Sequence, residues 1–387
     1  MSFLSNDKGL SSGGLQLSDM KVSILTDTLG FKSLKYEWGS LHQKSNSNSI
    51  FLSWEWLFTW WSTFNIDFDL NIIVVRDGAG ELVGLGPFCI RKRWHNFPLK
   101  ELAFLGASDV SSEYLDILSC PDSEAIVSNA VFETIHRHKT AWGCVNFSEV
   151  LETSLVNKYI KPLARKKNYT VTKSIARECS ILSLADTKEA VLAGFSGQLK
   201  STIKRRSRKL EGMGGVISYL EDENELDLYI SNLFALHQKR WNAVGIKGNF
   251  GEKSIQSFHS EVSRLFLKRS LLKIYTLTID GNVIAALYTF EFKGVMFYFQ
   301  SGYDPEWSKL SPGTVLMWRC ICDAIDRDVT HFDYLRGLEY YKSLWADKVS
   351  TTYSILFIPP ERGEVVSLFN VLNFVKKMKL AIKKFLP

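Results

Sequence analysis

Hydrophobic and polar residues follow two regular patterns along the chain, and the second half shows them more clearly. Strict alternation predicts strands, whereas apolar residues recurring every three or four positions predict helices. In the second half these patterns predict strands at 216–220, 272–279, 283–292, 295–301, 331–335 and 351–358. They predict helices from Leu226, around Ile255, and from Ser311 to Arg327, with a short segment at 340–346. Asp280-Gly281 and Lys293-Gly294 are turn sequences, so the three middle strands should form an antiparallel meander.

The first half repeats this order more faintly. Strands are expected at 21–25, 70–76, 82–90, 100–105 and 144–147, and helices at 54–64 and 123–138. The sequences IVVRDGAGELVGLGPF and LTIDGNVIAALYTF place an Asp-Gly turn at corresponding points, about 200 residues apart. The pattern favours a duplicated domain, although a shared turn and alternation can also arise by chance. We therefore expect an α/β protein of two tandem domains, with mixed, mostly antiparallel sheets flanked by helices.

Composition supports a folded protein with a large core. The chain has 387 residues, of which 45% are hydrophobic and 13% aromatic. The sequence has no run of 18 apolar residues, so we expect no transmembrane span. The Ser/Gly-rich start lacks the pattern of a secretory signal. The six cysteines are scattered, with neither CxxC pairs nor His at ligand spacing. They predict core thiols in a reducing cytosol and no metal site.

The net charge of +6 is concentrated in two short segments. The run KSTIKRRSRKL places Leu199, Ile203 and Leu210 on one helical face and basic residues elsewhere. Such a face is usually solvated, but it would also suit phosphate groups on an acceptor. No nucleic-acid partner is expected, because no aromatic residues interleave with the charges.

The C-terminal tail is the second basic segment. Apolar residues and lysines fall on opposite faces of a predicted helix at 361–387. This pattern predicts peripheral contact with an anionic membrane, with packing of the apolar face on the second domain as the alternative.

Several local sequences, in order, resemble the CelD-like branch of the GNAT acetyltransferase superfamily. They are LHQKRW (236–241), GNF (248–250), FQSGYDPEW (299–307), SPG (311–313) and FDYLRGLEYYKSLW (332–345), with FLSWEWLFTWW (51–61) in the first half. The order of strands and helices is also that of the GNAT fold, and the tandem arrangement resembles Fem-type enzymes. The resemblance implies a bacterial, cytoplasmic protein, free or at the inner face of the membrane, in polysaccharide or cell-envelope synthesis.

Domain bounds follow from this resemblance. We expect a flexible tail at 1–20, a GNAT-like domain at 21–185, an acyl-CoA-binding GNAT domain at 186–360, and the basic amphipathic helix at 361–387.

A donor site is predicted at the helix that begins with Ser311-Pro312-Gly313-Thr314. A helix start exposes unpaired N–H groups and the positive end of the dipole, and Ser311 is expected to cap it. The resemblance implies that acyl-CoA, most simply acetyl-CoA, binds here through its pyrophosphate, with Lys309 as an added cation. An ordinary helix start is the alternative. The corresponding start in the first half, Pro121-Asp122-Ser123, carries an acid and no glycine.

Catalytic residues are expected at the end of the strand that follows this helix. The resemblance implies that Lys342 or Arg336 stabilises an oxyanion, that Tyr341 or Tyr340 protonates the departing thiolate, and that Asp333 lies beside them. A structural ion pair between Asp333 and Arg336, with the aromatic rings filling core, is the alternative.

Acceptor residues are expected around the LHQKRW helix. His237 lies on the apolar stripe of that helix, which is typical of a core histidine, but the motif keeps it as a catalytic candidate. Asp304 or Glu306 could deprotonate an amine, or be solvated turn acids. The residues expected to bind the acceptor are Arg240, Trp241, Tyr303 and Asp304.

Three functions fit these features. The first is N-acylation of a small-molecule, nucleotide-linked or lipid-linked sugar by acyl-CoA. The second is Fem-type transfer from aminoacyl-tRNA, against which the lack of an inserted coiled-coil arm argues. The third is a non-catalytic binding module of a polysaccharide machine.

Overall fold

The fold is a mixed α/β structure built on one long sheet. The computed structural model describes residues 20–92, 99–243, 245 and 248–370. Along the sheet the strands run in the order β1-β2-β3-β4-β6-β13-β7-β12-β11-β10-β9-β8, and β5 (Leu118–Ser119) pairs with β3.

The first half contributes one end of the sheet. Its strands are β1 (Lys21–Leu25), β2 (Phe68–Arg76), β3 (Leu82–Arg91), β4 (Glu101–Phe104) and β6 (Cys144–Leu151). Its helices are α1 (Thr28–Ser33), α2 (Lys35–Lys44), α3 (Trp54–Phe64), α4 (Glu124–Arg137) and α5 (Lys161–Lys166), the last preceded by a π-helix at Val156–Ile160.

The second half contributes the other end. Its strands are β8 (Val216–Tyr219), β9 (Leu272–Ile279), β10 (Asn282–Phe292), β11 (Val295–Tyr303) and β12 (His331–Arg336). Its helices are α6 (Lys188–Gly194), α7 (Gly197–Glu211), α8 (Leu226–Asn242), α9 (Lys253–Leu267), α10 (Pro312–Ile325) and α11 (Tyr340–Ser343).

Both halves repeat one pairing scheme. In each, three successive antiparallel pairings are followed by a single parallel one, β4 with β6 in the first half and β11 with β12 in the second. This repetition agrees with the predicted tandem architecture. The domain bounds 21–185 and 186–360 stay a prediction.

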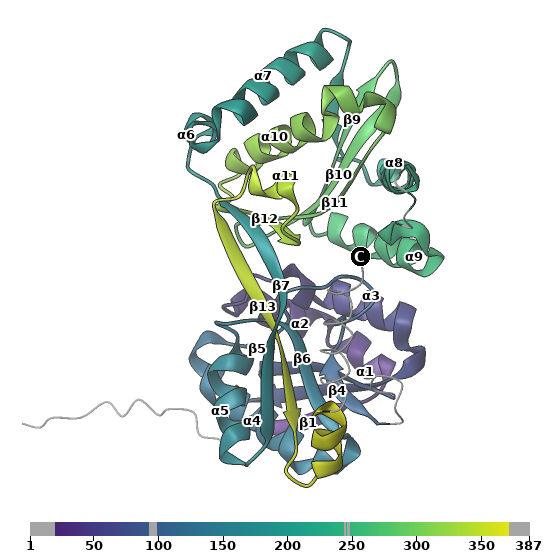
Figure 1. Cartoon of the computed structure of the whole chain (residues 1–387). Coiled ribbons are helices and arrows are strands. Elements are labelled where there is room, and N and C mark those ends of the chain that lie inside the picture. Colours follow the sequence, from purple (N-terminus) through teal and green to yellow (C-terminus); the bar gives the residue numbers. More distant parts are fainter. Residues whose placement is uncertain (1–19, 93–98, 244, 246–247, 371–387) are drawn as a thin grey trace, which may run out of the picture.

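The last strand of each half crosses into the other half. β7 (Thr170–Ser183) follows the first half in the chain but pairs with β12, whereas β13 (Lys348–Ile358) follows the second half but pairs with β6. β7 and β13 also pair with each other. Figure 1 shows these two strands as a long pair joining the lower and upper lobes. The exchange makes the sheet continuous.

Buried side chains also join the halves. Trp56 of α3 is fully buried and stacks edge-on against Phe258 of α9, so one core cluster spans both halves. Lys293, in the β10–β11 turn, donates hydrogen bonds of 2.7–2.9 Å to the carbonyl oxygens of His42, Ser45 and Ser47. These carbonyls lie at and beyond the end of α2, where backbone acceptors lack helical partners.

Ser311 corrects one expectation. It lies immediately before α10, but its side chain makes no capping hydrogen bond. Its backbone is left-handed (φ 51°) because it also ends the 3₁₀ helix Pro305–Leu310. Only its carbonyl serves the helix, accepting from the Thr314 N–H at 3.0 Å.

Both termini extend beyond the described residues. The predicted tail at 1–20 is described only at Met20, and the predicted helix at 361–387 only as far as residue 370. Val365 of this segment is buried against Leu356 and Ile358 of β13. Across the described parts of the chain, no helix combines the length and hydropathy needed to cross a membrane.

Candidate active site

Strands β11 and β12 separate partway along their length. They pair only from Val295 with His331 to Phe297 with Asp333, after which β11 continues along β10 as far as Tyr303. The separation leaves a wedge between two parallel strands, next to the start of α10. Sites in open α/β sheets are commonly built where neighbouring strands part.

A cavity of about 280 Å³ lies on the α10 side of this wedge. Six residues predicted from the sequence line it: Arg240, Tyr303, Ser311, Gly313, Thr314 and Tyr341. The structure therefore brings the predicted helix start together with part of the acceptor set and one catalytic candidate.

The start of α10 is open to a ligand. Pro312 occupies the first turn and has no N–H, and a Cβ placed on Gly313 would meet no atom within 4 Å. Hydroxyl groups of Ser308, Ser311 and Thr314 lie around it. Together with the helix dipole, these groups favour an anion.

The charge of the cavity also suits an anionic ligand. Arg240 is its single cation, and no Asp or Glu is among the described residues that line it. The Arg240 guanidinium lies 5.2 Å from the centre of the Tyr303 ring, a cation–π contact that holds it at the rim. The residues present thus fit the phosphate-bearing donor that the sequence implied.

Two tyrosines meet inside the cavity. The Tyr341 hydroxyl lies 3.5 Å from that of Tyr298, which lies 2.6 Å from the Ser301 hydroxyl. Burial, followed by the neighbouring Tyr298, raises the pKa of Tyr341, so its phenol stays protonated at neutral pH. Tyr298 and Ser301 were not predicted; the alternation along β11 could have indicated Tyr298 as an inward-facing polar residue.

Arg336 points away from this cavity toward the first half. Its Nε donates to Glu113 Oε1 at 2.6 Å, its backbone N–H donates to the same oxygen at 2.8 Å, and its Nη2 donates to the Ser112 carbonyl at 2.8 Å. Glu113 is completely buried. The anticipated Arg336–Asp333 pair is not formed in the described structure, because Arg336 engages Glu113 instead.

Asp333 is buried near this contact. Its Oδ1 accepts a hydrogen bond from the Leu335 N–H at 2.8 Å. Burial, followed by repulsion from Glu113, raises its pKa from 3.8 to about 7. Asp333 is not among the residues lining the cavity.

Lys342, in α11, is buried. Its Nζ donates to the Arg336 carbonyl and lies 3.0 Å from Glu339 Oε2. The ammonium thus joins α11 to the end of β12 and is not among the groups lining the cavity.

The remaining predicted residues lie around α8 and the loop after β11. His237 is fully buried, and its Nε2 accepts from Trp241 Nε1 at 2.9 Å. Burial lowers the His237 pKa to about 4. Asp304 Oδ2 accepts from Lys239 Nζ at 2.8 Å, and Lys309 is exposed outside the cavity lining.

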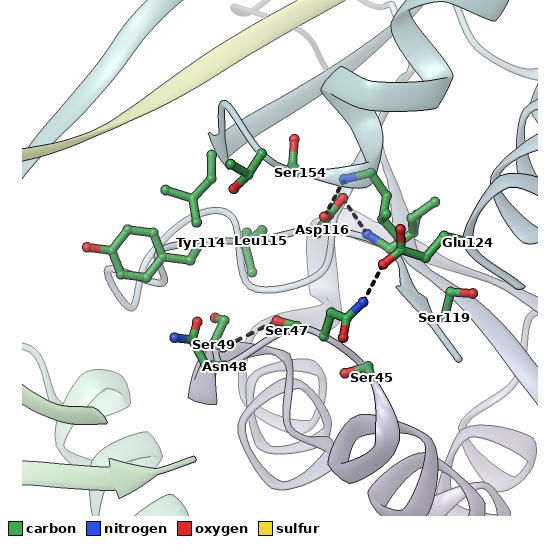
Figure 2. A pocket seen from close by; sticks show the side chains of 15 residues that line it. Ser45, Ser47, Asn48, Ser49, Tyr114, Leu115, Asp116, Ser119, Glu124 and Ser154 are labelled. Atoms are coloured by element: carbon green, nitrogen blue, oxygen red, sulfur yellow. Dashed lines mark hydrogen bonds between the residues drawn. The ribbon is translucent and has the colours of Figure 1, made fainter. Parts of the chain in front are cut away.

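The first half has a corresponding but smaller pocket. It measures about 150 Å³ and lies between the start of α4, the end of β6 and the serine-rich loop after α2 (Figure 2). Glu124, at the start of α4, accepts from Asn46 at 2.8 Å. Asp116 accepts from the N–H groups of Leu155 and Val156 at 2.7 and 3.2 Å. Two acidic side chains therefore line this pocket, and its described lining has no Lys or Arg, which disfavours phosphate.

Comparison with known proteins identifies a family for part of the second half. Residues 197–343 match the family model of the acetyltransferase (GNAT) domain. The second half thus contains a GNAT acetyltransferase domain, a class that uses acyl-CoA, and the protein is an acyltransferase. No curated protein sequence matches the chain.

Similar solved structures extend the likeness in fold to both halves. FemX aligns over 90% of this chain and 99% of its own, with a TM-score of 0.65 and 10% identity. The C-terminal domain of a putative lysylphosphatidylglycerol synthetase from Agrobacterium fabrum aligns over 88% and 96%, with a TM-score of 0.53 and 9% identity. L-PGS from Bacillus licheniformis aligns over 89% and 96%, with a TM-score of 0.51 and 13% identity. The CelD-like branch stays a prediction.

Proposed function

We propose that this protein transfers an acyl group, most simply acetyl, from acyl-CoA to an amine on a sugar or cell-envelope precursor. The observation that carries the proposal is the open start of α10, which meets the β11–β12 wedge in an acid-free cavity. Acyl-CoA supplies the thioester that reacts, and the residues of this chain bind and orient it.

Each group of the cavity has a role in this proposal. The Gly313 N–H and the Ser311 and Thr314 hydroxyls hold the pyrophosphate, and Lys309 adds a cation from the surface. The acceptor amine attacks the thioester carbonyl carbon and the C–S bond breaks. Tyr341 donates its proton to the departing sulfur, and the proton lost by the amine nitrogen returns to the Tyr341 oxygen. Tyr298, hydrogen-bonded to Ser301, orients the Tyr341 hydroxyl.

The acceptor is proposed to approach from the α8 side. Arg240 and Tyr303 line the cavity there. Trp241 follows Arg240 in α8, and Asp304 follows Tyr303 at the end of β11. A guanidinium stacked on a tyrosine suits an anionic group of the acceptor, such as a phosphate. His237, with its lowered pKa, is neutral at pH 7 and supports this wall through Trp241.

Positioning roles are proposed for the other predicted catalytic residues. Arg336 and Lys342 fix the β12–α11 loop that precedes Tyr341, and Asp333 holds the end of β12 through the Leu335 N–H. A cytoplasmic location, free or at the inner face of the membrane, belongs to the same proposal.

Aminoacyl-tRNA is a second candidate donor. The likeness to FemX over both halves favours it at the level of fold. The connection from α7 to β8 is only residues 212–215, so no coiled-coil arm is inserted at this point. A purely non-catalytic module is set aside because of the acetyltransferase domain at 197–343.

One experiment separates the two donors. Purified protein is incubated with acetyl-CoA and a panel of nucleotide-linked amino sugars, and free thiol is measured. Amine-dependent thiol release, together with a rise in melting temperature with acetyl-CoA alone, supports the proposal. Absence of both, with transfer of labelled amino acid from aminoacyl-tRNA, would establish the second donor instead.

A further inference from the structure

A second cavity lies between α7 and α10, on the outer face of the second half. It measures about 790 Å³, and Figure 1 shows α7 lying along α10 at this face. Apolar side chains form much of its wall: Leu192, Ile203, Leu210, Ile217, Val315 and Trp318. We call this cavity the α7–α10 groove. Its described lining shares no residue with the 280 Å³ cavity at the start of α10.

The charged residues of the groove are unequally paired. Lys188 pairs with Asp326 at 2.6 Å, and Arg319 pairs with Asp323 at 2.9 Å. Lys200, Lys204 and Arg208 also line the groove, but within the described chain they form no ion pair. Lys200 donates to the Ala193 carbonyl, at 3.2 Å. Glu211 is the one remaining acid in the lining. The groove therefore keeps an excess of positive charge.

These three cations also repel one another. They lie at successive four-residue steps along α7, which places them on one face of the helix. Like charges at this spacing destabilise a helix, and Arg205 and Lys209 beside them repeat the arrangement. An anion bound between the cations would remove this repulsion.

We propose that the α7–α10 groove binds an amphipathic phosphate, with the phosphate on Lys200, Lys204 and Arg208 and the apolar part against Ile203, Val315 and Trp318. The charge excess accounts for the phosphate, and the apolar wall accounts for the hydrocarbon part. Nucleic acid fits less well, because it would use the cations and not the apolar wall. The site does not depend on the donor of the acyl reaction.

Dodecyl phosphate, below its micelle concentration, is a direct probe. Calorimetric titration should show saturable binding, whereas glycerol phosphate and dodecyl maltoside should each bind at least 10-fold more weakly. The variant K204Q/R208Q should lose at least 10-fold in affinity for dodecyl phosphate. The control K32Q/R165Q removes the same charge from exposed positions in the first half and should bind normally.

Further experiments identify the source of the phosphate and separate this site from the acyl reaction. Co-sedimentation with phosphatidic acid vesicles that depends on Lys204 and Arg208 would identify a membrane lipid as the source. Absence of vesicle binding, with dodecyl phosphate still bound, would identify a soluble amphiphile. Acetyl-CoA affinity should be unchanged in K204Q/R208Q, so the groove and the proposed acyl reaction fail independently.

Four results would overturn the proposal. Two concern specificity: glycerol phosphate binds as tightly as dodecyl phosphate, or the control variant loses as much affinity for dodecyl phosphate as K204Q/R208Q. In the other two, CoA displaces dodecyl phosphate, or the protein binds tRNA but does not bind dodecyl phosphate. Melting curves of each variant establish that the fold is intact.

Discussion

Arg336 donates two hydrogen bonds to a single carboxylate oxygen of Glu113, which lies 223 positions earlier in the chain. Both the Arg336 backbone N–H and its Nε donate to Glu113 Oε1, at 2.8 and 2.6 Å. Glu113 comes from the first half and Arg336 from the end of β12, shortly before α11, which carries Tyr341. The first half therefore anchors the end of β12, which precedes the helix that carries Tyr341.

Breaking this pair should destabilise the protein. Arg336→Met leaves the buried Glu113 carboxylate without its cation, and we expect a loss of about 2–3 kcal/mol in unfolding free energy, measured in urea. The double variant E113Q/R336M should recover part of this loss. Arg177→Met, which removes an exposed cation 3.9 Å from Glu149, should cost less than about 1 kcal/mol. Equal losses for Arg336 and Arg177 would contradict the assignment.

Gly313 should control donor binding. Gly313→Asp places a carboxylate where the pyrophosphate is proposed to lie, so acetyl-CoA affinity should fall at least 10-fold without loss of folding. The matched control is Gly39→Asp in α2, where an added Cβ also meets no atom within 4 Å. Calorimetric titration and melting temperature separate binding from stability. Normal acetyl-CoA affinity in Gly313→Asp would place the donor elsewhere.

Tyr341 should act in the chemical step. Tyr341→Phe removes the proposed proton donor, so kcat should fall by about 10²-fold with little change in acetyl-CoA affinity. Its neighbour Tyr340 is 77% exposed, and Tyr340→Phe should leave kcat unchanged. If the two variants behave alike, the thiolate does not take its proton from Tyr341.

Asp116 should make stability depend on pH. Burial raises its pKa from 3.8 to about 7, so between these values the folded protein keeps a proton that the unfolded chain releases. The stability that this proton contributes is complete below pH 4 and is lost as the pH rises through 7. At about 1.4 kcal/mol per pKa unit, the loss amounts to a few kcal/mol.

Asp116→Asn tests this directly, because an amide has no such proton. The variant should gain stability relative to the native protein between pH 5 and pH 8, in urea titrations at both values. The exposed Asp122→Asn should follow the native protein. A constant difference between Asp116→Asn and the native protein across this range would show that Asp116 is ionised throughout.

The sequence predicted most of what is local and missed what is long-range. Helix 54–64 and strand 272–279 agree with the structure to the residue, because each depends on its own hydrophobic pattern. The helix start at Gly313 was likewise predictable from four consecutive residues. The Glu113–Arg336 contact was not, because nothing near either residue indicates the other. Ser311 was misjudged because the 3₁₀ helix before it sets its backbone.

The exchange of β7 and β13 was also beyond sequence patterns. Either strand has the same alternation whether it pairs within its own half or in the other, so periodicity cannot distinguish the two arrangements. The pairing of β13 with β7, which places Ser350 opposite Cys179 at the centre of the sheet, is visible only in the folded structure.

Exchanged strands also limit how this protein can be divided. A fragment ending before α6 would carry β7 without β12 and would leave β6 without β13, so each piece would expose an unsatisfied sheet edge. Two separately expressed pieces should therefore be insoluble alone but soluble when co-expressed or refolded together, since each holds the missing strand of the other.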